Sequence, residues 1–207
     1  MTVLSAHGVD EAPRPGETPE ALVRRLSRAK ALAVAGEVHD LPVIVAADTV
    51  VAFEGEILGK PYSLAEADAV LRRLRERVHQ VYTGVTVVEL GARRLMTDAC
   101  VTDVPMRAYG DEEIDSYLAT GDPLDKAGSY AIQHAGFHPV AELSGCYANV
   151  MGLPLCHLTR MLRRLGIMPR TDVPDACRKS TGYVCPIAGQ VLSADAPAPE
   201  AYDSETK

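Results

Sequence analysis

The sequence contains no tryptophan, and only two of its 207 residues are phenylalanine. No apolar run approaches the roughly 18 residues of a membrane span, and the first ten residues lack the cationic start and apolar stretch of a signal peptide. Basic residues are in the minority, since 21 Lys and Arg face 28 Asp and Glu. The resulting charge of -7 argues against general affinity for a nucleic acid polymer or a membrane. We therefore expect a cytoplasmic protein.

Cysteine is scarce, and its spacing follows no common framework. The five cysteines are odd in number and include no C-x-x-C motif, which indicates neither a set of disulfides nor a zinc finger. Buried or incidental thiols are the simplest interpretation. Cys177 and Cys185 could also join Cys156 and His157 at a metal, although this spacing matches no known zinc site.

The remaining composition is that of a globular protein, with 47% hydrophobic and 24% charged residues. A chain of this length can bury a substantial core in one domain. We place that domain at residues 1–167. Five of the 14 prolines fall after Met168, so residues 168–207 are predicted to form a largely disordered tail.

Hydrophobic periodicity and capping residues predict alternating helices and strands. The predicted helices are 18–36, 64–74, 111–119 and 153–166, and the predicted strands are 41–53, 78–90 and 93–105. The polar, glycine-rich stretch 122–145 is predicted to be an ordered functional loop with a returning strand. This order predicts the α/β class, with a mixed twisted sheet, helices packed on it and a cleft between sheet and loops.

Asp48 interrupts the most apolar predicted strand. An ionised carboxylate without partners there would cost several kcal/mol, so Asp48 either reaches a cleft or caps a local turn. Glu11 is a second carboxylate, near the start of the chain, where surface exposure alone would explain it. If the two converge, their oxygens could hold a divalent cation such as Mg²⁺.

Two lysines, Lys60 and Lys126, lie close to glycines in predicted loops. Lys60 lies in GEILGKP, whose glycines are one residue too close for a phosphate-binding P-loop, and a proline follows the lysine. Lys60 is therefore either a point charge for phosphate or an ordinary exposed lysine. Lys126 precedes Gly128 by two residues, and Gln133 carries an amide that could read a base edge.

Six motifs occur in an order that resembles the Maf family of nucleoside triphosphate pyrophosphatases. They are VDE (9–11), ADTVV (47–51), LGKP (58–61), HQVYTGV (79–85), YLATGDPLDKAGSYAIQ (117–133) and YANVMGLPL (147–155). The resemblance covers about residues 9 to 166. It implies an α/β fold with an elongated central cleft, a divalent metal cofactor (Mg or Mn) and a homodimer. The implied reaction is hydrolysis of a nucleoside triphosphate to the monophosphate and pyrophosphate.

The resemblance also assigns roles to the acidic residues and the lysines. Asp48 matches the family's catalytic acid/base, and the metal is expected at Asp48 with Glu11. Lys60 and Lys126 match lysines that are expected near the phosphates of the substrate.

Two further matches concern the base. Thr49 and Gln133 match residues tied to base selection, and their identities resemble the branch that acts on dTTP and UTP. Family members usually carry an S-x-S-P-R-R loop after their first strand, and no such segment occurs in this sequence. We therefore expect weaker triphosphate binding. Two functions stay open, an active pyrophosphatase and a catalytically impaired Maf-like nucleotide-binding or regulatory protein.

Overall fold

The computed structural model describes residues 2–38 and 42–202, so the predicted start of a strand at residue 41 lies outside the described residues. Five strands form one sheet in the order β2-β1-β3-β4-β5, and every pairing is antiparallel. The strands are β1 (Val43–Phe53), β2 (Glu56–Leu58), β3 (Val78–Glu89), β4 (Arg94–Pro105) and β5 (Glu200–Ala201). The α/β class is confirmed, with an antiparallel sheet.

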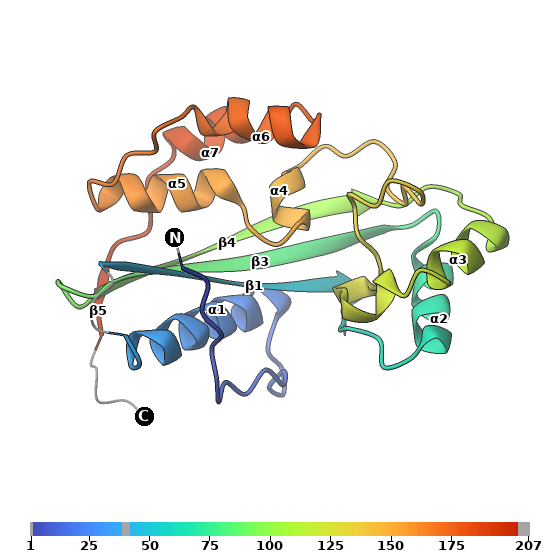
Figure 1. The fold of residues 1–207 in the computed structure, drawn as a ribbon, viewed down its shortest axis with the longest axis horizontal. Helices are drawn as coiled ribbons and strands as arrows, with labels where there is room; N and C mark the ends of the chain where they lie inside the picture. The colour runs from blue at the N-terminus through green and yellow to red at the C-terminus, as the bar shows by residue number, and fades with distance from the viewer. Residues whose placement is uncertain (1, 39–41, 203–207) are drawn as a thin grey trace.

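Helices cover both faces and one end of this sheet (Figure 1). They are α1 (Pro19–Ala35), α2 (Leu64–Leu74), α3 (Asp111–Leu118), α4 (Tyr147–Val150), α5 (Leu155–Arg164), α6 (Val173–Thr181) and α7 (Ala188–Ser193). Helix α1 lies against one face of β1 and β3, whereas α4 and α5 lie against the other face, with α6 and α7 beyond them. No helix within the described ranges is long and apolar enough to cross a membrane.

Helix α1 forms as its sequence predicts and packs directly on the backbone of β3. The Thr18 hydroxyl accepts a hydrogen bond from the Ala21 N–H at 3.2 Å, and Pro19 occupies the first turn. A Cβ atom on Gly84 of β3 would lie only 2.2 Å from the Val23 carbonyl oxygen. Glycine at position 84 therefore allows the helix to approach the strand closely.

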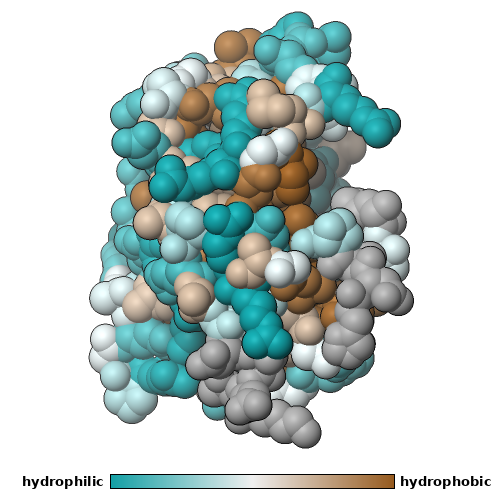
Figure 2. Space-filling view, turned by 90° about the vertical axis from the view of Figure 1, so that its left-hand side faces the viewer, coloured by the Kyte–Doolittle hydropathy of each residue, from teal (hydrophilic) through white to brown (hydrophobic). Residues whose placement is uncertain are grey.

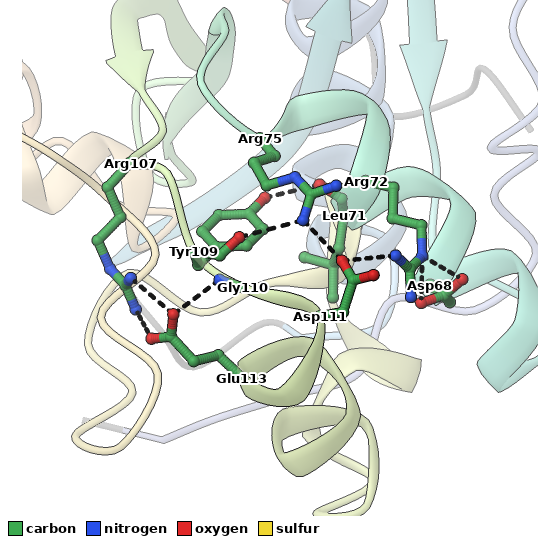
Figure 3. Close-up of polar contacts among 9 residues, drawn as sticks. All are labelled: Asp68, Leu71, Arg72, Arg75, Arg107, Tyr109, Gly110, Asp111 and Glu113. Carbon is green, nitrogen blue, oxygen red and sulfur yellow. Dashed lines mark hydrogen bonds and ion pairs between the residues drawn. The ribbon is translucent and has the colours of Figure 1, made fainter.

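A network of arginines and carboxylates joins α2 to α3 at one end of the sheet (Figure 3). The Asp111 carboxylate pairs with Arg72 and Arg75 at 2.7 Å each. The Tyr109 hydroxyl donates to the Leu71 carbonyl oxygen at 2.7 Å. Because these bonds connect both helices, the two helices support the loops between β2 and α2 and after α3 as one unit.

The stretch 122–145 differs from its prediction. Two 3-10 turns, η1 (Asp122–Asp125) and η2 (Ala127–Ser129), occupy its first part, and the predicted returning strand is reduced to one bridge between Met106 and Val140. Gly128, Ser129 and His138 all have positive φ, at 71°, 61° and 44°, and such left-handed backbone interrupts an extended strand. The prediction of an ordered loop holds, whereas the strand is wrong.

Residues 168–202 contain two helices and a short strand where the composition predicts disorder. The Asp172 carboxylate caps α6 by accepting from the Asp175 N–H at 2.8 Å, and Gly182 ends the helix in a left-handed conformation. β5 then pairs with the start of β4. The domain boundary at residue 167 stays a prediction.

The surface at the β5 end of the molecule mixes polar and apolar side chains. Figure 2 views this end and shows a strip of hydrophobic atoms between hydrophilic ones. Val45 of β1 is among the exposed large hydrophobic residues of the chain, at 41%. β2 pairs only with residues 51–53 of β1, so within the described chain the outer edge of β1 from 43 to 50 is uncovered by another strand.

Candidate active site

Asp48 lies in the middle of β1 and faces helix α1. Its register partner is Gly84, the residue that α1 approaches, so both positions belong to the α1 face of the sheet. The residue is 9% exposed, and its Oδ1 accepts a hydrogen bond from Lys30 Nζ at 2.6 Å. The carboxylate therefore pairs with a helix lysine and does not cap a local turn.

Lys30 of α1 also pairs with Glu11 at 2.8 Å, so it bridges the two carboxylates that the sequence analysis singled out. The sequence analysis missed this lysine. Its signal is positional, because Lys30 follows the buried residues Leu26 and Ser27 by four and three positions, which places it on the inward face of α1. A lysine on such a face needs an acidic partner.

Burial and pairing oppose each other in this cluster. Burial raises the pKa of Asp48, and the hydrogen bond and charge of Lys30 offset this only in part. Burial lowers the pKa of Lys30, but its hydrogen bonds to Asp48 and Glu11 outweigh burial and leave the pKa raised. Lys30 is thus held as a cation beside a carboxylate with a raised proton affinity, a combination suited to general-base chemistry.

The two carboxylates fit a divalent cation in part. Asp48 and Glu11 already converge on one positive group, the Lys30 ammonium. Mg²⁺ commonly uses one or two carboxylates and takes its other ligands from substrate phosphates and water. Within residues 2–38 and 42–202, three or more His, Cys, Asp or Glu side chains do not come together in a way that could hold a metal. Asp48 and Glu11 could therefore supply only part of such a site.

Thr49 faces the opposite side of the sheet and lines a cavity of about 260 Å³. Lys60, Lys126 and the turn Val150–Gly152 line the same cavity. The two lysine loops meet because the Gly128 N–H donates to the Gly59 carbonyl oxygen at 3.2 Å. Asp125 beside Lys126 raises the pKa of that lysine, which keeps it charged.

The hydrogen bonds around Thr49 fix the direction of its hydroxyl. Thr49 and Thr83 share a bond of 2.9 Å between their hydroxyl oxygens, and Thr83 donates to the Asn149 carbonyl oxygen at 3.1 Å. Since Thr83 has one proton to donate, Thr49 is the donor in the shared bond. The Thr49 oxygen therefore faces the cavity as an acceptor.

Buried hydrogen bonds hold the residues around the cavity in place. Asn149 Nδ2 donates to the Val81 carbonyl oxygen at 2.9 Å and to Thr102 Oγ1 at 3.0 Å. Tyr130 lines the cavity, and its hydroxyl bonds His79 Nε2 at 2.8 Å. Burial lowers the pKa of His79 to about 4, so this imidazole is neutral near pH 7. These contacts hold the cavity walls with uncharged groups.

The predicted site residues thus form two groups separated by one strand. Glu11 and Asp48 lie together on the α1 face, while Thr49, Lys60 and Lys126 lie together at the cavity. The outer edge of β1 runs between the groups, in the segment that β2 leaves uncovered. Gln133 is exposed and does not line the cavity. Its predicted role in base selection stays a prediction.

Comparison with known proteins identifies the family. A family model described as Maf-like protein matches residues 1–165. The chain is 43% identical over 159 residues to a dTTP/UTP pyrophosphatase of Pelotomaculum thermopropionicum, covering 77% of this chain and 83% of that protein. It is 49% identical over 148 residues to the protein of the same name from Carboxydothermus hydrogenoformans, covering 72% and 79%.

A third relative matches further along the chain. The dTTP/UTP pyrophosphatase of Thermomicrobium roseum is 41% identical over 191 residues, which covers 90% of this chain and 84% of that protein. The matched 90% of this chain is longer than the 165 residues of the family model, so the match must include residues after 165. The extent of the family match and these identities show that the chain belongs to the Maf family.

Proposed function

We propose that this chain hydrolyses nucleoside triphosphates of the dTTP/UTP type, or modified pyrimidine nucleotides, to the monophosphate and pyrophosphate. One observation carries the proposal. A buried carboxylate with a raised pKa, Asp48, lies next in sequence to Thr49, which lines a cavity with two lysines. The names of the relatives support the same reaction.

The triphosphate would bind where the charges are positive. Lys60 and Lys126 line the cavity and would offset the charge that develops on the leaving pyrophosphate. Because Asp48 lies on the other face of β1, the substrate would extend across the uncovered edge of that strand. A bent nucleotide would place its α-phosphate at that edge, with both the base and the leaving pyrophosphate on the cavity side.

Asp48 would accept the proton of the water that attacks the α-phosphorus. Its raised pKa improves this transfer, and the Lys30 ammonium stabilises the ionised form that is needed before it. Asp48 and Glu11 would hold a divalent cation, which in phosphoryl chemistry neutralises part of the phosphate charge when bound. The divalent cation and its coordination by Asp48 and Glu11 are thus part of the proposed function.

The acceptor oxygen of Thr49 suits a pyrimidine with a ring N–H. Uracil and thymine both donate from N3, whereas cytosine has an acceptor there, so the acceptor at Thr49 would favour dTTP and UTP over cytosine nucleotides. Gln133 would contribute only if its exposed side chain turns toward the base. A homodimer and a cytoplasmic location stay predictions.

Incubation of the purified chain with dTTP, UTP, CTP and 7-methyl-GTP in the presence of Mg²⁺ or Mn²⁺ tests the proposal. We expect pyrophosphate and monophosphate from dTTP and UTP. We also expect Thr49→Val, which removes the acceptor, to prefer dTTP and UTP over CTP less strongly than the wild type does. Nucleotide binding without pyrophosphate release would contradict the proposal and favour the impaired binding protein. Equal hydrolysis of all four nucleotides would contradict the base preference alone.

A further inference from the structure

All five cysteines of the chain lie in one region of the fold, although they come from five segments. They are Cys100 in β4, Cys146 before α4, Cys156 in α5, Cys177 in α6 and Cys185 before α7. Cys100 and Cys146 are buried in one apolar cluster, and Cys177 packs against it. All five thiols are free.

Cys146 is the centre of this thiol cluster. Its side chain interacts with those of both Cys100 and Cys185. The Cys100 interaction, with smaller help from the Asn149 and Ala148 N–H groups at the start of α4, outweighs burial and lowers the pKa of Cys146 to about 7. The same interaction and burial raise the pKa of Cys100. Cys146 is therefore more readily ionised than its neighbour Cys185, whose pKa is raised by burial.

The cluster is not arranged for a metal. In the part of the chain that the structure describes, no three His, Cys, Asp or Glu side chains are placed to ligate one ion. The metal site considered for Cys156, His157, Cys177 and Cys185 is therefore not formed. Neighbouring free thiols can form a disulfide when an oxidant is present.

The C-terminal segment holds Cys185 close to Cys146. The Tyr183 hydroxyl lies 3.0 Å from both the Leu143 and Gly145 carbonyl oxygens. Cys185 Sγ donates to the same Gly145 oxygen at 3.7 Å, next in sequence to Cys146. Cys185 is partly exposed and belongs to a connecting segment, whereas Cys100 is fixed in the middle of a paired strand. A disulfide needs backbone adjustment that the segment at Cys185 permits more easily.

We propose that Cys146 and Cys185 are a modification site at which hydrogen peroxide forms a disulfide. The Cys146 thiol loses its proton and the thiolate attacks peroxide, so an S–O bond forms, the O–O bond breaks, and the leaving hydroxide takes up that proton to give one water. The Cys185 thiol then attacks the sulfur of the sulfenic acid, forming the S–S bond and releasing a second water. The two thiols together lose two electrons, and one peroxide is reduced to two waters.

The bridge would join the C-terminal segment to the chain that enters α4. That helix starts at Tyr147, and the turn that follows it lines the cavity beside Thr49. The modification site therefore lies one short helix from the proposed nucleotide site. The bridge itself does not depend on the proposed hydrolysis, and its test needs no activity measurement.

Peptide mapping of the full chain tests the site. The reduced protein is treated with equimolar hydrogen peroxide, its remaining thiols are alkylated, and trypsin is added. Cys146 and Cys156 share the peptide 127–160, while Cys185 is the only cysteine of 180–207. We expect these two peptides to be linked, with a mass two hydrogens below their sum plus one alkyl group on the remaining cysteine of 127–160, and alkylatable thiols to fall from five to three. Reduction with dithiothreitol should separate them.

Three variants assign the bridge to its cysteines. Cys156→Ser should keep the linked peptides, which places the bridge on Cys146, and Cys185→Ser should lose them. Cys177→Ser is the matched control, a partly exposed neighbour of the same cluster that should keep the link. A bridge from 127–160 to Cys100 or Cys177, five alkylatable thiols after treatment, or irreversible oxidation without a link would each overturn the proposal. If a variant does not fold, fragmentation of the wild-type linked peptide between Cys146 and Cys156 in a mass spectrometer assigns the bridge.

Discussion

The two faces of the β1–β3 pair carry different chemistry. On the α1 face, Asp48 and Gly84 lie opposite each other, and the carboxylate is paired with a lysine. One residue further, Thr49 and Thr83 lie opposite each other on the other face and border an open cavity. Period-two alternation thus gives neighbouring residues of one strand separate chemical roles.

Burial acts on both faces but produces opposite pKa shifts. On the α1 face it raises the pKa of Asp48, and on the cavity face it lowers the pKa of His79 to about 4. Both shifts favour the uncharged form, since low polarity penalises charge of either sign. Asp48 has a counter-ion, Lys30, which stabilises its charged form, whereas the hydrogen-bond partner of His79 is the uncharged Tyr130 hydroxyl.

Asp48→Asn removes the proton acceptor from the α1 face while it preserves the side-chain shape. We expect kcat for dTTP to fall about 1000-fold, the middle of the range for general-base catalysis. Because the pKa of Asp48 is raised, wild-type kcat/KM should fall on acidification at a higher pH than an ordinary aspartate would give. Pyrophosphate release measures both, with the exposed Asp103→Asn as control. Unchanged turnover in Asp48→Asn would disprove the assignment.

Gly84→Ala tests the close packing that lets α1 present Lys30 to Asp48. The new Cβ would lie 2.2 Å from the Val23 carbonyl oxygen, a backbone atom that cannot move alone. We expect the free energy of unfolding to fall by about 3 kcal/mol or more, the upper range for overpacking. Urea denaturation measures it. Gly91→Ala, where a Cβ meets nothing within 4 Å, should leave stability nearly unchanged.

His79→Gln tests the uncharged support on the cavity face. The folded state resists protonation of His79, whereas the unfolded chain binds that proton at its ordinary pKa of about 6.5. Stability from this group should therefore be lost as pH falls from about 6.5 to about 4, by about 3 kcal/mol at pH 4. Glutamine does not titrate, so the variant should show a shallower loss of stability in acid. If urea denaturation shows that the wild type and the variant lose the same free energy of unfolding between about pH 6.5 and about pH 4, this prediction is contradicted.

Lys126→Ala tests the cationic side of the cavity. We expect kcat/KM for dTTP to fall about 30-fold, or about 2 kcal/mol of transition-state stabilisation, because a charge near the phosphates is lost. Lys60→Ala should act similarly. The exposed Lys179→Ala in α6 is the matched control, since it removes a lysine from outside the cavity. An equal loss in the control would show a general charge effect instead of phosphate binding.

Local signals were enough to predict most of the fold. Thr18 and Pro19 begin α1 as predicted, and the strand pair around Gly91 closes with Glu89 opposite Arg94. These features depend on neighbouring residues, whose preferences can be read directly. The order in residues 168–202 was missed because it depends on contacts such as Tyr183 with Gly145, which composition does not encode.

Several residues of the candidate site were named from the sequence, but Lys30 and the arrangement of the site were not. Asp48 stood out because a carboxylate is costly in an apolar strand, and its partner Lys30 emerged only when α1 docked on the sheet. Strand alternation already implied that Asp48 and Thr49 face opposite sides, yet it could not show which loops reach the cavity. The meeting of the Lys60 and Lys126 loops depends on a backbone bond between two glycines.

The C-terminal segment also shields one side of α5. Leu155, Leu158 and Leu162 line a space whose other wall is α6, including Val173 and Ala176. A recombinant fragment that stops at residue 165 would uncover these leucines and leave two carbonyl groups without the tyrosine that now binds them. Such a fragment would expose an apolar helix surface to solvent and tend to aggregate. Expression of residues 1–165 alone should therefore give less soluble protein than expression of the whole chain.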